Sequence, residues 1–459
     1  MNNSKISIQF LGAAETVTGS KHLLKTPELN ILVDCGLFQG LKQLRLKNRE
    51  KLPFNEKDID ILLITHAHLD HCGYIPLLVK NGFKGKILMT SPTRDLVEII
   101  LRDSAEIQEE EARRANEEGY SKHSPALPLY IEKDVENSLK LFEVRKDEEW
   151  YELSNNISFR YIKNGHILGS CFIEIECFGR KITFSGDIGR KENDLLNAPS
   201  ILENADFLIM ESTYGDRLHP KGKAIDDLQD VITDTIKKGG TLLIPSFAVE
   251  RAQELMYLIN KLKSDKKIPD LPVYLDSPMG ATTTDIFLNN PSWHKLSPSE
   301  AHTISSNISI IREFSDTLKL LKDKQSKIVI AASGMLTGGR VLSYLTEFGR
   351  SPKNTILQVG FQGEGTRGRA LKDGIRELKM FGKYFQIEAE VKNIDKMSGH
   401  ADQFEMIEWL RNFKEKPDKL FIVHGEPQAQ NIFRVKIQDE LSIYPIIPKL
   451  CEEFELFQL

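Results

Sequence analysis

The sequence is poor in cysteine and has no long apolar run. Its five cysteines are odd in number and form no Cys-x-x-Cys pair. This usage excludes a disulfide scaffold and favours free thiols in a reducing compartment. No apolar run is long enough to span a bilayer, and residues 1–5 lead into a strand pattern rather than a secretory signal. We therefore expect a cytoplasmic globular protein.

The chain also lacks an excess of positive charge. Its net charge is −5 and its pI is about 6.2, which argues against broad, nonspecific coating of nucleic acid. A local basic groove remains compatible with these values, because bound metal ions would themselves attract phosphate. A chain of 459 residues is too long for one ordinary domain and indicates two or three.

Histidine is scarce, yet it is concentrated in one segment. Of the 11 histidines, three fall within residues 66–71, His-Ala-His-Leu-Asp-His. The apolar run at 59–64 precedes this segment and predicts a buried strand that ends at the cluster. Imidazole and carboxylate together suit zinc, manganese or iron(II), whereas the alternative is a charged surface loop. A single catalytic ion needs only three protein ligands, so this cluster suggests a dinuclear centre completed from elsewhere.

Further metal-type residues stand at predicted strand ends beside glycine. They are Asp34, His166, Asp187 and His424. Taken singly, each is more commonly an ordinary loop residue. Together with the histidine cluster, they are predicted to be metal ligands or neighbours of ligands.

In their order and flanking residues, these motifs resemble the metallo-β-lactamase superfamily. They are most similar to its β-CASP branch of nucleases, which includes the RNase J enzymes and the endonuclease subunit of the polyadenylation machinery. The resemblance covers essentially the whole chain. It implies an α/β fold, in which a four-layer αββα metallo-β-lactamase domain carries an inserted parallel-sheet α/β (β-CASP) domain. The expected divisions are 1–211 and 391–459 for the first domain and 212–390 for the insert.

The resemblance also assigns the metal ligands. It implies two Zn²⁺ ions per chain, with Mn²⁺ as the alternative. One ion would be held by His66, His68 and His166, the other by Asp70, His71 and His424, with Asp187 bridging. Asp34 would orient a ligand histidine by accepting its other ring N–H.

The activity implied by the family is hydrolysis of phosphodiester bonds in single-stranded RNA, endonucleolytic and also 5′-exonucleolytic in some members. A hydroxide held between the ions would attack phosphorus and leave a 5′-phosphate and a 3′-hydroxyl. The implied catalytic residues are Asp34, Asp187, Glu211 and His400. His400 would protonate the leaving oxygen, and Glu211 would keep it oriented and protonated. The alternative for Glu211 and His400 is a structural ion pair.

The segment 212–390 alternates apolar runs with helical patterns. The runs at 241–246, 272–277, 327–333 and 355–360 are nearly continuous, as in a parallel sheet covered on both faces. Small-residue loops with arginines follow them. Backbone N–H groups at turns and guanidinium forks suit phosphate, so we expect RNA contacts there. The candidates are Ser246, Arg251, Arg340, Arg367 and Arg369, with Ser398 beside the scissile phosphate. Arg367 departs from many relatives, which carry an aliphatic residue there.

Other elements are expected in the flanking segments. A long helix is predicted from residue 93 to about 118, because Leu96, Val97, Ile100, Leu101 and Ile107 keep helical spacing. Its second half is charged and should be solvated. A helix at about 403–413, a strand at 419–423 and an alternating edge strand at 452–457 should return the chain to the first domain.

Three rival functions share parts of this pattern. A small-molecule hydrolase of the superfamily, such as a thioesterase or lactonase, would share the ligands but has no need for the 212–390 insert. A β-CASP DNA nuclease typically carries Val where this chain has His424, so that residue favours RNA. A noncatalytic scaffold subunit would have lost ligands, whereas every ligand position is filled here. The family also suggests a homodimer.

Overall fold

The structure is a computed structural model that describes residues 5–119, 123–304 and 306–459. It divides into two compact units. The first comprises residues 1–193, 197–218 and 400–459, and the second comprises 194–196 and 219–399. The chain therefore leaves and re-enters the first unit a few residues later than the sequence analysis expects. All the predicted metal ligands, together with Glu211 and His400, belong to the first unit.

The first unit contains a seven-stranded mixed sheet in the order β21-β1-β2-β3-β4-β5-β6. Strands β3 to β6 are parallel, whereas β21, β1, β2 and β3 pair antiparallel. The C-terminal strand lies at the edge, as its alternating pattern predicts. The bounds are β1 Lys5–Phe10, β2 His22–Lys25, β3 Asn30–Val33, β4 Ile61–Leu63, β5 Lys86–Met89, β6 Phe142–Val144 and β21 Glu453–Gln458.

A second sheet of this unit has the order β20-β11-β10-β9-β8-β7. Strands β10, β11 and β20 are parallel neighbours. Their carboxyl ends therefore meet at one edge of the sheet, although their sequences are far apart. The bounds are β7 Tyr151–Ser154, β8 Ile157–Lys163, β9 Cys171–Cys177, β10 Arg180–Phe184, β11 Phe207–Glu211 and β20 Lys419–Val423.

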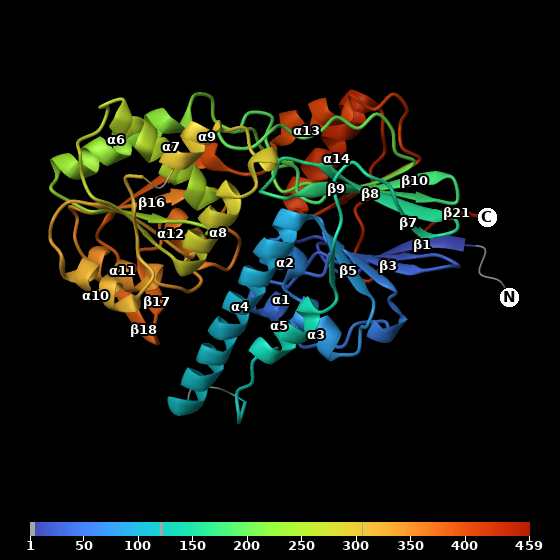
Figure 1. Cartoon of the computed structure of the whole chain (residues 1–459), viewed down its shortest axis with the longest axis horizontal. Helices are drawn as coiled ribbons and strands as arrows, with labels where there is room; N and C mark the ends of the chain where they lie inside the picture. The colour runs from blue at the N-terminus through green and yellow to red at the C-terminus, as the bar shows by residue number, and fades with distance from the viewer. Residues whose placement is uncertain (1–4, 120–122, 305) are drawn as a thin grey trace. The chain divides into compact units, whose positions relative to one another are not determined.

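The two sheets lie face to face between helices (Figure 1). Phe10 of β1 and Phe421 of β20 meet across the interface, with ring centroids 5.0 Å apart. On the outer face of the six-stranded sheet, α13 packs through Trp409 against Phe172, and α14 packs through Phe433. The helices of this unit are α1 Lys42–Lys47, η1 Glu56–Asp58, α2 Leu69–Cys72, α3 Ile75–Lys80, α4 Ser91–Glu117, α5 Glu132–Leu139, α13 Gln403–Leu410 and α14 Pro427–Leu441. This is the predicted αββα arrangement.

Helix α4 matches the long helix predicted from residue 93 to about 118. Leu96, Val97 and Leu101 are fully buried, and Ile100 is nearly so. Ile107 is the exception, because its side chain is 40% exposed in the charged second half of the helix. The apolar stripe therefore ends about one turn earlier than its spacing suggests.

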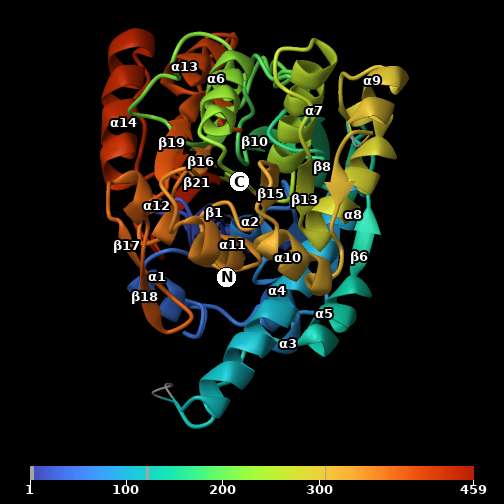
Figure 2. The same ribbon diagram turned by 90° about the vertical axis from the view of Figure 1, so that its left-hand side faces the viewer.

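The second unit is built on a six-stranded sheet in the order β14-β13-β15-β12-β16-β19, all parallel. Strands β12, β15 and β16 are buried throughout, which confirms the parallel sheet predicted from the near-continuous apolar runs. Figure 2 looks onto this unit, with α6 and α7 on one side of the sheet and α10 and α11 on the other. Val329 and Ile356 pack with Leu345 of α11 in its core.

The elements of the second unit have the following bounds. The strands are β12 Leu242–Pro245, β13 Val273–Asp276, β14 Ser309–Ile310, β15 Ile328–Ala331, β16 Thr355–Val359 and β19 Glu390–Ile394, with a hairpin of β17 Glu377–Met380 and β18 Lys383–Gln386. The helices are α6 Ala224–Lys237, α7 Arg251–Ser264, α8 Pro278–Leu288, η2 Pro291–Trp293, α9 Pro298–Thr303, α10 Phe314–Lys322, α11 Val341–Phe348, α12 Arg367–Lys372 and η3 Asp395–Met397.

Two further findings concern the cysteines and the helices of the described residues. All five cysteines are free thiols. Among the helices of the described residues, none combines the length and the hydropathy needed to cross a bilayer.

Candidate metal centre

The predicted metal ligands of the first unit all follow strand ends. His66 and His68 lie in the loop after β4, while Asp70 and His71 lie in the short helix α2 that follows this loop. His166 follows β8, Asp187 follows β10 and His424 follows β20. The ligand atoms of His66, His68, His166 and Asp187 lie within 4.8 Å of one another and form one set, and those of Asp70, His71 and His424 form another.

The first set has the spacing of a tetrahedral site. Nε2 of His66 lies 3.1 Å from Nδ1 of His68, which lies 3.2 Å from Nε2 of His166. Oδ2 of Asp187 is 3.4 Å from the His66 nitrogen and 3.5 Å from the His166 nitrogen. Ligand atoms about 2.1 Å from a tetrahedral ion lie about 3.4 Å from one another. These donors therefore fit a single ion of zinc size.

The second set has the same spacing. Nε2 of His71 is 3.2 Å from Nε2 of His424, which is 3.4 Å from Oδ2 of Asp70. The other oxygen of Asp187, Oδ1, is 3.3 Å from the His71 nitrogen. Each oxygen of the Asp187 carboxylate thus faces a different set of ring nitrogens. This is the geometry that a carboxylate shared by two ions requires.

The polar atoms of the centre are not satisfied by hydrogen bonds alone. Asp187 Oδ1 is buried and has no hydrogen-bond partner among the described residues. Burial lowers the pKa of His66 to about 3 and that of His68 to about 4. Burial also takes the pKa of His166 well below its usual value. Neutral imidazoles present lone pairs, so three such rings meeting a carboxylate fit a metal ion better than an ion-pair network.

His71 has a different electrostatic environment. Burial disfavours its charged form, but the carboxylates of Asp187 and Asp34 outweigh burial and raise its pKa well above the usual value. Nδ1 of His71 lies 2.7 Å from Oδ2 of Asp34. Asp34 therefore accepts the ring N–H and leaves Nε2 turned toward the second set, as an orienting partner should.

Two threonines orient other ligand rings, and sequence reasoning missed both. Thr65 Oγ1 lies 3.0 Å from Nδ1 of His66, and Thr213 Oγ1 lies 3.1 Å from Nδ1 of His424. Thr65 also donates its backbone N–H to Asp34 at 2.8 Å. Thr65 directly precedes His66 in the sequence, whereas Thr213 follows β11, the strand that pairs with the β20 strand before His424. No local pattern distinguishes these threonines from others at strand ends.

The backbone at two of these positions adopts the left-handed region. Asp34 has a φ of 60° and His424 a φ of 51°, which is uncommon for residues other than glycine. In both cases the turn comes directly after a strand and directs the side chain into the centre. Such conformations cost about 1–3 kcal/mol and concentrate at functional sites.

Glu211 and His400 form a pair beside the centre. Glu211 is fully buried at the end of β11, and its carboxylate oxygens lie 3.1 and 3.2 Å from Nδ1 of His400. The backbone N–H groups of Ile188 and Thr213 also donate to this carboxylate. Burial alone would lower the pKa of His400, but Glu211 raises it to about 9. The His400 ring is 4.5 Å from the ring of His166 between centroids.

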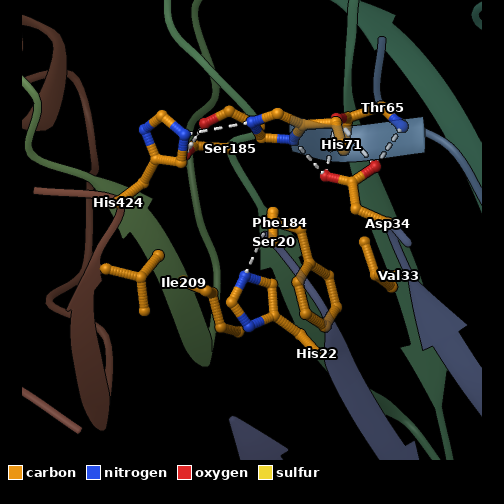
Figure 3. A pocket seen from close by; sticks show the side chains of 12 residues that line it. Ser20, His22, Val33, Asp34, Thr65, His71, Phe184, Ser185, Ile209 and His424 are labelled. Atoms are coloured by element: carbon orange, nitrogen blue, oxygen red, sulfur yellow. Dashed lines mark hydrogen bonds and ion pairs between the residues drawn. The ribbon is translucent and has the colours of Figure 1, made fainter. Parts of the chain in front are cut away.

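A small cavity lies beneath the centre (Figure 3). Its volume is about 10 Å³, enough for a single water. His22 forms part of its wall, stacks on Phe184, and lies 3.3 Å from Ser20 Oγ through Nε2. Burial lowers the pKa of His22 to about 3, so its ring is neutral. With Val33 and Ile209 also lining it, this cavity is the floor of the centre and too small for a substrate.

The residues predicted to bind phosphate all lie in the second unit. Arg340 pairs with Asp276 at 2.6 Å, and Arg369 pairs with Asp373 at 2.9 Å. Arg251 is buried and forms an ion pair with Glu254. Ser246 donates its hydroxyl to the carbonyl of Phe247, and Ser398 is buried directly after η3.

Arg367, which is expected to depart from the family pattern, also has internal partners. Its guanidinium donates to the backbone carbonyls of Lys379, Leu336 and Thr337. It thereby links the loop after β15 to the β17–β18 hairpin. Of these arginines, only Arg369 combines a solvent-exposed side chain with an equally exposed partner.

Three protein-family models match the chain. The metallo-β-lactamase superfamily matches residues 20–238, the Beta-Casp domain matches 252–371, and the Zn-dependent metallo-hydrolase RNA specificity domain matches 384–448.

Curated proteins match over nearly the whole chain. Ribonuclease TTHA0252 of Thermus thermophilus is 32% identical over 91% of this chain and 92% of its own length. An RNase J-like protein of Methanocaldococcus jannaschii is 31% identical over 96% of this chain and 98% of its own length. Transcription termination factor FttA of Methanosarcina mazei is 31% identical over 92% of this chain and 67% of its own length. Among solved structures, a protein of unknown function from Enterococcus faecalis V583 shares the fold, with a TM-score of 0.56 and 13% identity over 98% of this chain and 100% of that one.

Proposed function

The chain belongs to the β-CASP branch of the metallo-β-lactamase superfamily, and from this premise we propose a zinc-dependent ribonuclease that cleaves single-stranded RNA. The observation that carries the proposal is the Asp187 carboxylate, whose two oxygens face separate sets of ligand-spaced nitrogens. Such a centre serves metal-dependent hydrolysis of phosphodiesters. Products with a 5′-phosphate and a 3′-hydroxyl are the expected outcome.

Each of the two sets of side chains is assigned to one metal ion. His66, His68 and His166 would hold one ion, and Asp70, His71 and His424 would hold the other. When bound, the pair of ions supplies a water of lowered pKa and polarises the phosphodiester. Zinc fits the first set best, because three neutral imidazoles and a carboxylate are typical zinc ligands. Manganese is the alternative to be tested.

Asp34, Thr65 and Thr213 keep the ligand rings in place. Asp34 and Thr65 contact the Nδ1 atoms of His71 and His66, whose Nε2 atoms face the centre. Thr213 contacts Nδ1 of His424, which also lies 3.4 Å from Asp187 Oδ1. They fix the tautomer and the ring plane, so that no reorganisation is needed when substrate binds.

His400 is the proposed general acid. Glu211 holds its Nδ1, which leaves Nε2 to carry a proton to the leaving oxygen of the RNA. The rival role is a structural ion pair. The position of the His400 ring against His166 supports catalysis, because a structural pair gains nothing from lying beside a ligand.

RNA is favoured as the substrate by the names of the relatives and by His424. Two relatives that match over nearly their full length are named a ribonuclease and an RNase J-like protein, and one family model describes RNA specificity. Phosphate contacts by Ser246, Arg251, Arg340, Arg367, Arg369 and Ser398 stay predictions. A homodimer also stays a prediction, which sedimentation velocity would test.

The proposal is tested with metal-quantified protein and matched RNA and DNA oligonucleotides, labelled internally and at the 5′ end. A His400→Ala preparation controls for contaminating nucleases. Cleavage of RNA alone, absent in the variant, is the expected result, and the label positions report endonucleolytic or 5′-exonucleolytic cutting. Turnover of neither nucleic acid by fully loaded protein would overturn the ribonuclease and promote the small-molecule hydrolase. Metal-free protein restored with zinc or with manganese identifies the ion.

A further inference from the structure

A buried lysine lies beneath the loop that carries Asp70 and His71. The Lys21 residue is only 1% exposed, and its ammonium group sits 4.9 Å from the ring centroid of Phe38 and 4.7 Å from that of Tyr74. Within the described chain no carboxylate forms a salt bridge with it. Burial lowers the pKa of Lys21 to about 8. A buried cation without a counter-ion is costly, so its retention calls for a specific role.

The ammonium group is held by two backbone carbonyls. It donates to Gly36 at 2.5 Å and to Gly19 at 3.3 Å. Gly36 lies two residues after Asp34, and Gly19 lies in the loop before β2. Lys21 therefore joins two segments that are separate in sequence, and its aromatic neighbours supply the remaining favourable electrostatics.

These two segments form hydrogen bonds to the backbone of the loop that carries Asp70 and His71. The N–H of Ser20 donates to the carbonyl of Asp70 at 2.8 Å, and the N–H of Cys35 donates to the carbonyl of His71 at 2.7 Å. The N–H of Gly36 in turn donates to the carbonyl of Ser20 at 3.0 Å. The peptide units of Asp70 and His71 are thus fixed by the same two strand-end loops that the Lys21 ammonium ties together.

The contact between these backbones is very close. A Cβ placed on Gly36 would lie 1.6 Å from the carbonyl oxygen of Asp70, so only glycine fits there. A shift of the Gly36 peptide would therefore be passed directly to Asp70 and His71. The loop carrying His66 is also bonded to Asp34 through Thr65, but it has further anchors, since Ile64 and Thr65 make backbone hydrogen bonds to β5 and β9.

We propose that Lys21 is a positioning residue that fixes Asp70 and His71 and thereby sets the affinity of the metal site formed by Asp70, His71 and His424. The site formed by His66, His68 and His166 does not depend on it to the same degree. This inference rests on the metal-dependent function proposed above, because it concerns one of the two ion sites of that centre.

The test is a stepwise metal titration of metal-free protein in competition with a chromophoric chelator, using Zn²⁺ alone. The Lys21→Met variant keeps the aliphatic bulk and removes the donors. Loss of a residue that orients metal ligands typically lowers the metal affinity roughly 10–100-fold. We therefore expect the protein to bind one of its two zinc equivalents about tenfold or more weakly. The other equivalent should bind as in the wild type. A His424→Ala variant identifies the affected step, because it removes a ligand of the dependent site.

Lys327 offers a matched control in the second unit. It is also fully buried, donates to the carbonyls of Asp323 and Gln325 at 2.7 and 2.8 Å, and lies 5.8 Å from the Phe348 ring centroid. Unlike Lys21, it also pairs with the Asp323 carboxylate at 3.1 Å. Lys327→Met removes the same group from a similar setting and should leave both equivalents unchanged. If Lys21→Met does not fold, Lys21→Gln retains an amide donor and should show a smaller, still selective loss.

Equal weakening of both equivalents, or none in a folded Lys21 variant, would overturn the inference. The titration needs no RNA. Wild-type protein that binds two ions but cleaves no RNA would therefore defeat the proposed ribonuclease and leave the role of Lys21 standing, whereas selective loss with normal RNA cleavage by the wild type supports both.

Discussion

The two units use their charged side chains in opposite ways. In the first unit, ring nitrogens approach one another to 3.1–3.2 Å, and a buried Asp187 oxygen has no hydrogen-bond partner among the described residues. In the second unit, the guanidinium groups of Arg340 and Arg367 are bonded to carboxylate and carbonyl oxygens of the same unit. The first arrangement fits a metal ion, which would satisfy these donors. The second is already satisfied, so a basic residue in a glycine-rich loop is weaker support for a ligand than unsatisfied donors.

The largest effect is expected at Asp187, the residue on which the contrast depends most. Asp187→Asn removes the charge that faces both sets of nitrogens. Residues that only orient a ligand typically change metal affinity roughly 10–100-fold. For Asp187→Asn we expect a larger loss of affinity for both metal ions, and the rate of RNA cleavage should fall with it. Elemental analysis after dialysis, together with an RNA cleavage assay, checks this. Loss of only one equivalent would show that the carboxylate does not bridge.

His400 comes next, because its proposed role is to protonate the leaving oxygen and not to hold an ion. His400→Ala should lower the rate of cleavage by roughly 10²–10⁴-fold. Metal content should stay at the wild-type level, because His400 belongs to neither set of predicted ligands. Glu211→Gln keeps a hydrogen-bond acceptor for the His400 ring, so its cleavage rate should lie between those of the wild type and His400→Ala. A variant that loses metal together with activity would place His400 in the ligand sphere.

Arg340 tests the other side of the comparison. Its guanidinium is only 19% exposed and pairs with the fully buried carboxylate of Asp276, which also accepts from the Tyr344 hydroxyl. Arg340→Met leaves that carboxylate without its cation, and breaking such a pair costs about 3–5 kcal/mol. Chemical denaturation should show this loss of stability. Arg340→Met with Asp276→Asn should recover part of it, which a role in phosphate binding alone would not explain.

Thr213 should give a smaller and more selective effect. Its hydroxyl contacts Nδ1 of His424 and also donates to the His424 carbonyl. Thr213→Val keeps the shape and removes the hydroxyl, so the affinity of the site that contains His424 should fall roughly 10–100-fold. Thr213→Ser is the control that restores the hydroxyl. Unchanged metal binding in the valine variant would leave Thr213 a structural residue only.

The gathering of these His and Asp side chains could be predicted because their signal is local. Each lies within a few residues of an apolar strand, and the strand order then brings them together where strands of the two sheets end. The parallel sheet of the insert could be predicted for the same reason, since strands buried on both faces are apolar throughout.

The partners of those residues could not be predicted, because they depend on strand order. Asp276 and Arg340 meet only because β13 and β15 are neighbours in the sheet. Thr213 meets His424 because β11 pairs with β20. Likewise, Lys21 looks like an ordinary strand residue until the two loops that it joins are seen to hold Asp70 and His71.

Substitution of Arg369 is expected to have the smallest effect on stability, and it compares an exposed arginine with the buried Arg340. Its pair with Asp373 is exposed on both sides and spans one helical turn, and such pairs contribute little to stability, at most about 1 kcal/mol. Arg369→Ala should therefore leave the denaturation midpoint nearly unchanged. If this guanidinium meets the RNA backbone, KM should rise severalfold and become less sensitive to salt, while kcat stays the same. Unaltered KM across a salt series would remove Arg369 from the RNA contacts. It would then join Arg340 and Arg367 as an arginine that serves the insert itself, and the phosphate-binding surface would have to be sought among other residues.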